Sequence, residues 1–147
     1  MYFIDAKGVP TPLNFRIHHF GPYSRELDYA TENLEIEGAI TVTKNPSGQG
    51  FIITPGIRSE KWIESGQEFL KKYKEVIDDV LSSLPNDAKI LELWSTTHFV
   101  ANAMNKFYDG ASKEKVIDEV VKIKQDKFSK DEIAKAYDEL MNLNFLQ

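Results

Sequence analysis

The chain of 147 residues is long enough for one domain with a sizeable core, and its lack of cysteine excludes disulfides, thiolate chemistry and cysteine-ligated metal sites. The formal net charge of −5 opposes the positive field on which binding to nucleic acid usually depends. The apolar runs are too short to span a membrane and the first residues lack the features of a signal peptide, so we expect a cytoplasmic protein with no membrane partner.

The N-terminus predicts a short helix followed by a linker. Met1 to Asp5 resembles the last turn of an apolar helix, and residues 6–12 contain two prolines that prevent regular helix. Because so short a helix is unstable alone in water, we expect it to dock on something or to be the remainder of a longer element. Alternating apolar and polar residues over 13–18 then predict an extended segment.

The most distinctive stretch is residues 18–24, HHFGPYS, which we interpret as a structural corner. Gly21 and Pro22 are expected to end the extended segment. Ser24 is placed to cap a helix that runs to about Glu37, and Gly38 is the expected left-handed residue at the end of that helix.

The helix after Ser24 has apolar residues on two faces. Leu27, Ala30 and Leu34 share one face, whereas Tyr29 and Ile36 lie roughly opposite. A helix with one buried side does not need the second face, so we infer that this helix is sandwiched between two layers.

A β-hairpin is predicted next, with strands over 40–43 and 51–54 and with Gly48-Gln49-Gly50 in its loop. A helix, a glycine and a hairpin follow one another in the last helix and wing of a winged-helix domain. Residues 1–56 are therefore expected to form a partial winged-helix-like part.

Residues 57–147 predict a bundle of four helices. The first is expected to start at Thr54-Pro55 and to end near Leu84. Its apolar residues recur at helical spacing: Trp62, Phe69, Tyr73, Val76 and Val80. The second, capped by Asn86, runs from Asp87 to about Asn105 and is apolar nearly all round, so it is the expected central helix.

Asp109-Gly110 is expected to break the central helix. Ser112 then starts an amphipathic helix that runs to about Gln125, and a capping box of Ser129 and Glu132 starts the last helix. The predicted fold class is thus mostly α with a small β-hairpin, in a single domain of residues 1–147.

Residues 14–40, NFRIHHFGPYSRELDYATENLEIEGAI, resemble the YwgA-like and SocA-like antitoxin families, the latter also called Panacea domains. The shared sequence features are a strand, a Gly-Pro-Tyr-Ser turn, and a helix with Glu-Leu near its start and Gly-Ile/Leu at its end. The hairpin, the long helix, a core helix with a histidine such as His98, and a closing Lys-Phe-Ser-x-x-Glu-Ile segment also look like the YwgA branch. The similarity covers about residues 13–147.

The resemblance implies an antitoxin-like function, because the SocA branch binds a toxin protein and can present it for degradation. Such proteins normally begin with one or two helices before the strand, whereas here Met1 to Asp5 looks like the end of the second. Either the chain is truncated, or its start is misassigned, or a partner replaces the missing helices.

The histidines and Ser24 are the only candidates for chemistry. His18 and His19 point to opposite faces of an extended segment, so a metal site would need His98 or carboxylates from elsewhere. We expect one of the pair to be a hydrogen-bonding group at the edge of the core and the other to be exposed. His98 shares a stripe with apolar residues and is expected to be a satisfied core residue, and capping accounts for Ser24. No catalytic residue, metal or cofactor is therefore predicted.

Charge opposes the DNA binding that a winged helix suggests. Residues 24–38 carry one arginine against five acidic residues, and the hairpin offers only Lys44. The lysines between Lys113 and Lys130 alternate with acids, as expected of a solvated face.

Protein binding is the function that these observations favour. Tyr29 and Ile36, together with Met1 to Ile4, need cover that either a partner or the C-terminal helices must supply. We predict a non-catalytic protein-binding module, antitoxin-like or adaptor-like, whose partner is a toxin-like protein or a second copy in a homodimer formed through the N-terminal region. The expected partner-binding residues are His19, Phe20, Tyr23, Tyr29 and Ile36. The alternatives are a winged-helix transcriptional regulator and an enzyme or metal-binding protein that uses the histidines.

Overall fold

A computed structural model describes residues 1–46, 48, 50–107, 110 and 112–146. In chain order, its elements are α1 (Tyr2–Ala6), β1 (Arg16–His18), β2 (Gly21–Tyr23), α2 (Arg25–Ile36), β3 (Ile40–Lys44), β4 (Phe51–Pro55), α3 (Ser59–Ser65), α4 (Gln67–Ser83), α5 (Ala88–Phe107), α6 (Lys113–Lys124), the 3₁₀ turn η1 (Gln125–Lys127) and α7 (Lys130–Asn142). This confirms a mostly α fold with a small β-hairpin.

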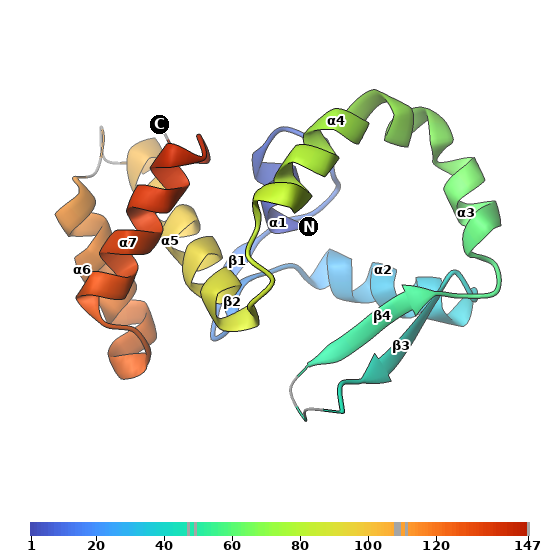
Figure 1. The fold of residues 1–147 in the computed structure, drawn as a ribbon, viewed down its shortest axis with the longest axis horizontal. Helices are drawn as coiled ribbons and strands as arrows, with labels where there is room; N and C mark the ends of the chain where they lie inside the picture. Colours follow the sequence, from blue (N-terminus) through green and yellow to red (C-terminus); the bar gives the residue numbers. More distant parts are fainter. Residues whose placement is uncertain (47, 49, 108–109, 111, 147) are drawn as a thin grey trace.

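The elements form two parts (Figure 1). Helices α5, α6 and α7 pack on one another as a bundle, with α1 beside them. The second part, residues 25–83 from α2 through α4, curves away from the bundle and returns to it as an open arch. We call this second part the arm.

The core lies in the bundle and includes α1. α5 is buried through Leu93–His98, Val100 and Ala101, which confirms it as the central helix. Phe3 and Ile4 of α1, followed by Val9, join the same core as Phe145 and Leu146 at the other end of the chain. The N-terminal helix therefore docks on its own chain, and Met1 to Ile4 do not need a partner to cover Phe3 and Ile4.

The arm, in contrast, has almost no core. Among its described residues, only Ala39 and Val80 are buried hydrophobic residues. α2 buries no residue, so the prediction that it is sandwiched between layers is wrong for a single chain. The apolar stripe of α4 reaches the core only at its C-terminal end, where α1 packs on it, so α4 is not the fourth member of the predicted bundle. The C-terminal helices do not fold back over Tyr29 and Ile36, both of which are exposed.

Three element boundaries differ from those predicted. Thr54 and Pro55 belong to β4, paired with Thr41 and Ile40, so the helix starts only at Ser59. Gly66 then separates α3 from α4, in line with the low helix propensity of glycine. Asp87, not Asn86, caps α5 by accepting a hydrogen bond from the Ile90 amide at 2.9 Å.

The capping predictions at Ser24, Ser112 and Ser129 are confirmed. The Ser24 and Ser112 hydroxyls accept hydrogen bonds from the third amide of their helices, and Ser129 with Glu132 forms a complete capping box. Gly38 adopts a left-handed φ of 71°. The predicted loop at Gly48-Gln49-Gly50 and the predicted break at Asp109-Gly110 each include a residue outside the described ranges, so both stay predictions.

The corner is a second small hairpin rather than a simple turn. β1 pairs with β2 in antiparallel register, with Arg16 opposite Tyr23 and His18 opposite Gly21. The extended segment therefore continues through Pro22, and the chain reverses at His19 and Phe20. Gly21 is buried against α5 with a φ of 112°, which side chains with a Cβ rarely adopt.

Alanine at Gly21 should destabilise the protein more than alanine at Gly8. Both glycines have a left-handed φ, but a Cβ at Gly21 would lie 3.0 Å from Ser95 Oγ, whereas a Cβ at Gly8 meets no atom within 4 Å. We expect Gly8→Ala to cost about 1 kcal/mol of unfolding free energy and Gly21→Ala at least about 2–3 kcal/mol. Urea denaturation of both variants tests this, and equal losses would contradict tight packing of the corner on α5.

Candidate functional site

The corner presents an exposed aromatic rim on a buried base. His18, His19, Phe20 and Tyr23 are all exposed, whereas Gly21 and Ser24 are buried and Pro22 is half-buried. The His19 ring stacks edge-on against Phe20, with ring centroids 4.8 Å apart. Both histidines are exposed, so the prediction that one of them is a hydrogen-bonding group at the edge of the core is wrong.

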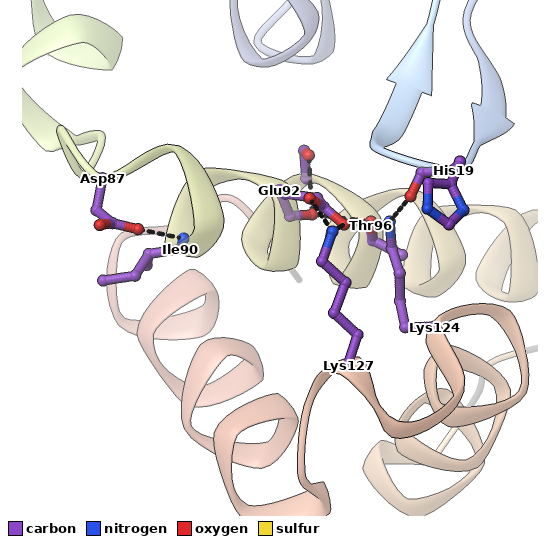
Figure 2. A network of polar contacts seen from close by, with 8 residues as sticks. His19, Asp87, Ile90, Glu92, Thr96, Lys124 and Lys127 are labelled. Carbon is purple, nitrogen blue, oxygen red and sulfur yellow. Dashed lines mark hydrogen bonds and ion pairs between the residues drawn. The ribbon is translucent and has the colours of Figure 1, made fainter. Parts of the chain in front are cut away.

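A buried ion cluster fixes the corner to the bundle (Figure 2). Lys124 Nζ donates to Glu92 Oε1 at 2.7 Å and to the His19 carbonyl oxygen at 2.7 Å. Lys127 Nζ donates to both carboxylate oxygens of Glu92, at 2.8 and 2.7 Å. The side chains of Lys124 and Glu92 are only 2% and 9% exposed. The corner, α5 and α6, which are far apart in sequence, therefore meet at the ammonium group of Lys124.

The protonation state of Glu92 follows from its two lysines. Burial opposes ionisation, but the hydrogen bonds and charges of Lys124 and Lys127 outweigh burial, so the pKa of Glu92 lies below its usual value. Sequence analysis placed Lys124 on a solvated face and missed this role. The available signal was spacing, because Lys124 follows Val116 and Val120 at intervals of four residues and so shares the buried face of α6.

His98 is a satisfied core residue, as predicted from its apolar stripe. Its Nε2 lies 2.9 Å from the Phe145 carbonyl oxygen and its Nδ1 lies 2.7 Å from the Tyr2 hydroxyl. Since a carbonyl can only accept, Nε2 carries the proton and Nδ1 accepts from Tyr2. Burial lowers the pKa of His98 to about 4, and the positive charge of Lys7 acts in the same direction. The ring joins the N-terminal helix to the C-terminal tail.

The three histidines are not brought together as metal ligands. Among the described residues, no group of three or more His, Asp or Glu side chains is arranged to hold a metal. Ser24 has the contacts of a cap, because its Oγ accepts from the Leu27 amide at 3.3 Å and donates to Glu26 at 2.8 Å. These contacts, together with Asn14, hold the pKa of Glu26 well below its usual range.

Apolar hollows adjoin Phe20, one toward β4 of the arm and the other toward α1 and α5. One cavity of about 710 Å³ is lined by Phe20 and Phe51, together with Gly50, Ala88, Lys89, Glu92 and Lys127. A second, of about 430 Å³, includes Phe20, Pro22 and Leu27 in its lining. Phe20 is 71% exposed, so both hollows are accessible to another molecule.

The arm carries most of the exposed apolar side chains. Between Tyr29 and Leu81 lie twelve of the twenty exposed large hydrophobic residues of the described chain: Tyr29, Ile36, Phe51, Ile52, Ile53, Ile57, Trp62, Ile63, Phe69, Leu70, Val76 and Leu81. Ile57 is 97% exposed and Ile36 is 81% exposed. The sequence predicts Tyr29 and Ile36 as contact residues, but it places the apolar stripe of α3 and α4 in the core. Most of this exposed surface is therefore not predicted from the sequence.

Comparisons with protein-family models, curated proteins and solved structures give no match. The resemblance to the YwgA-like and SocA-like families, and with it the winged-helix and antitoxin interpretations, therefore stays a prediction. In the described part of the chain, no helix is both long enough and apolar enough to cross a membrane.

Removing the charge of Glu92 should destabilise the fold, because Lys124 would stay buried without its counter-ion. We expect Glu92→Gln to cost roughly 3–5 kcal/mol of unfolding free energy, as for other broken buried ion pairs. The matched control is Asp118→Asn, which breaks the exposed 2.7 Å pair with Lys130 and should cost far less. If both variants lost the same unfolding free energy in chemical denaturation, the buried cluster would contribute no more to stability than the exposed pair.

The low pKa of His98 predicts that stability falls on acidification. The folded protein keeps this ring neutral down to a pKa of about 4, whereas the unfolded chain takes up a proton below about 6.5. Between these values His98 should remove up to about 1.4 kcal/mol of stability per pH unit. His98→Gln should flatten the dependence of unfolding free energy on pH in this window. A steep slope that persists in His98→Gln would contradict this.

Proposed function

We propose that this chain is a non-catalytic protein-binding module, antitoxin-like or adaptor-like, that works in the cytoplasm. The observation that carries the proposal is the uncovered apolar surface of the arm, which continues through Phe51 to the hollows around Phe20. Surfaces of this kind are rare on isolated soluble proteins and mark sites where another protein binds.

The predicted contact residues support this surface as a binding site. Phe20, Tyr29 and Ile36 are exposed, and Phe20 lines the hollows beside the arm. Aromatic side chains that fill a partly desolvated hollow are the usual anchors of a protein interface. The proposal assigns no reaction to the histidines, since His98 is engaged by Tyr2 and Phe145.

The alternative of a DNA-binding regulator gains no support from the arm. The first two turns of α2 expose Glu26, Asp28 and Glu32, and Lys44 is the only basic residue in the two strands β3 and β4. Phosphates need cations or hydrogen-bond donors, so this face opposes a duplex. Tight binding to duplex DNA at low salt in an electrophoretic shift would overturn this argument.

A photo-crosslinking amino acid placed on the arm tests the proposal in cells. We expect a residue of this kind at Ile57 to form crosslinks to protein, because Ile57 is the most exposed large hydrophobic residue of the described arm. The control position is Met141, an exposed residue of α7 outside the arm. Protein adducts at Ile57 but not at Met141 would support binding through the arm, and their mass would separate a second copy from another protein. No protein adduct from Ile57 would contradict the proposal.

A further inference from the structure

The chain exposes far more surface than a compact protein of its size. Its accessible surface is 10397 Å² for a mass of 16.8 kDa. A compact monomer of that mass exposes about 7,700 Å². The excess is thus about 2,700 Å² per chain, and the open arch of the arm holds most of the exposed large hydrophobic residues of the described chain (Figure 1).

The arm cannot be stable with this surface in water. α3 has seven residues, and isolated helices of that length do not hold their structure. β3 and β4 form a two-stranded sheet, which is marginal alone. Since the described residues 25–79 bury no hydrophobic side chain except Ala39, these elements require cover from outside the chain.

The excess surface matches what a homodimer would bury. Two chains together carry about 5,400 Å² of excess, and obligate homodimers bury about 2,000–5,000 Å² or more in total. Transient encounters and standard complexes bury much less, about 1,600 Å² or below. The area therefore favours a permanent partner of similar extent over a small ligand or a short peptide.

The arm carries charges of both signs, with seven basic and eleven acidic residues between Arg25 and Asp79. Lys74 and Asp78 form the only ion pair between described residues of the arm. Lysines such as Lys71 and acids such as Glu32 lack an ion pair with any described residue, so both signs lie unpaired beside the apolar surface. In two-fold symmetry a lysine of one arm can face an acid of the other, but the net charge of −4 on each arm opposes association, so the pairing depends on apolar burial.

We propose that two copies of this chain pair through their arms, so that the apolar face of each arm is buried by the partner copy. The interface then includes α3 and α4. Neither helix belongs to the N-terminal region through which the sequence predicts a homodimer. This inference rests on the proposed binding function of the arm and names its occupant. Each bundle keeps its own hydrophobic core in the pair.

Sedimentation equilibrium of the full chain and of two single variants tests the pairing. Phe69 on α4 and Met141 on α7 are 41% and 40% exposed, so they form a matched pair of equal exposure on different surfaces. We expect twice the 16.8 kDa chain mass for the parent and for Met141→Asp across the micromolar range. Phe69→Asp should weaken association at least tenfold, because a desolvated charge is costly at an apolar interface.

The circular dichroism of the helices and the acid dependence attributed to His98 report whether the bundle of each variant is still folded. A monomeric parent that binds a hydrophobic dye would overturn the pairing but would leave the arm as a surface for a different protein. A monomeric parent that binds no dye would overturn both the pairing and the proposed function. A dimer that Phe69→Asp and Met141→Asp disturb equally would also overturn pairing through the arm.

Discussion

The rest of this structure depends on one constraint, which is that large apolar surfaces must be covered from water. The bundle meets it within one chain, because α5 is surrounded by α1, α6, α7 and the C-terminal tail. The arm does not, since it is an open arch in which only Ala39 and Val80 of the described residues are buried hydrophobic residues. Secondary structure of this extent survives only where side-chain burial offsets the loss of conformational entropy. The proposed pairing of two arms would supply this burial.

The corner connects these two parts and explains why the arm has a defined direction. Lys124 reaches from α6 to the His19 carbonyl while it is held by Glu92 of α5, so the hairpin of β1 and β2 is fixed to the bundle (Figure 2). Ser24, directly after β2, starts α2. A rigid origin matters for a binding arm, because ordering a flexible segment on binding costs affinity.

Local signals in the sequence predicted the elements well. Ser24, Ser112 and Ser129 cap helices because the hydroxyl and the amide it accepts from are only three residues apart. Thr54-Pro55 misled because proline suits the last residue of an edge strand as well as the first turn of a helix, and pairing with Ile40 decided between the two. The residues next to Pro55 in the sequence contain no information on its pairing with Ile40.

The partners of the elements were not predictable in the same way. The stripe through Trp62, Phe69 and Val76 has the period of a buried face, but the period does not say whether the cover comes from the same chain. The burial of Lys124 is not predicted either, because a charged side chain is expected to face solvent unless its counter-ion on another helix is known. Of the candidate site, the sequence therefore indicated Phe20, Tyr29 and Ile36 but neither the α3–α4 surface nor the Glu92 cluster.

Hydrogen exchange of the backbone amides in α4 at increasing protein concentration tests the central claim most directly. If a second copy covers the arm, protection of residues 67–79 should rise with concentration by mass action, while amides of α5 in the bundle core stay equally protected throughout. Protection of α4 that is strong and independent of concentration down to a demonstrated monomer would contradict the account, because the arm would then be stable without a partner.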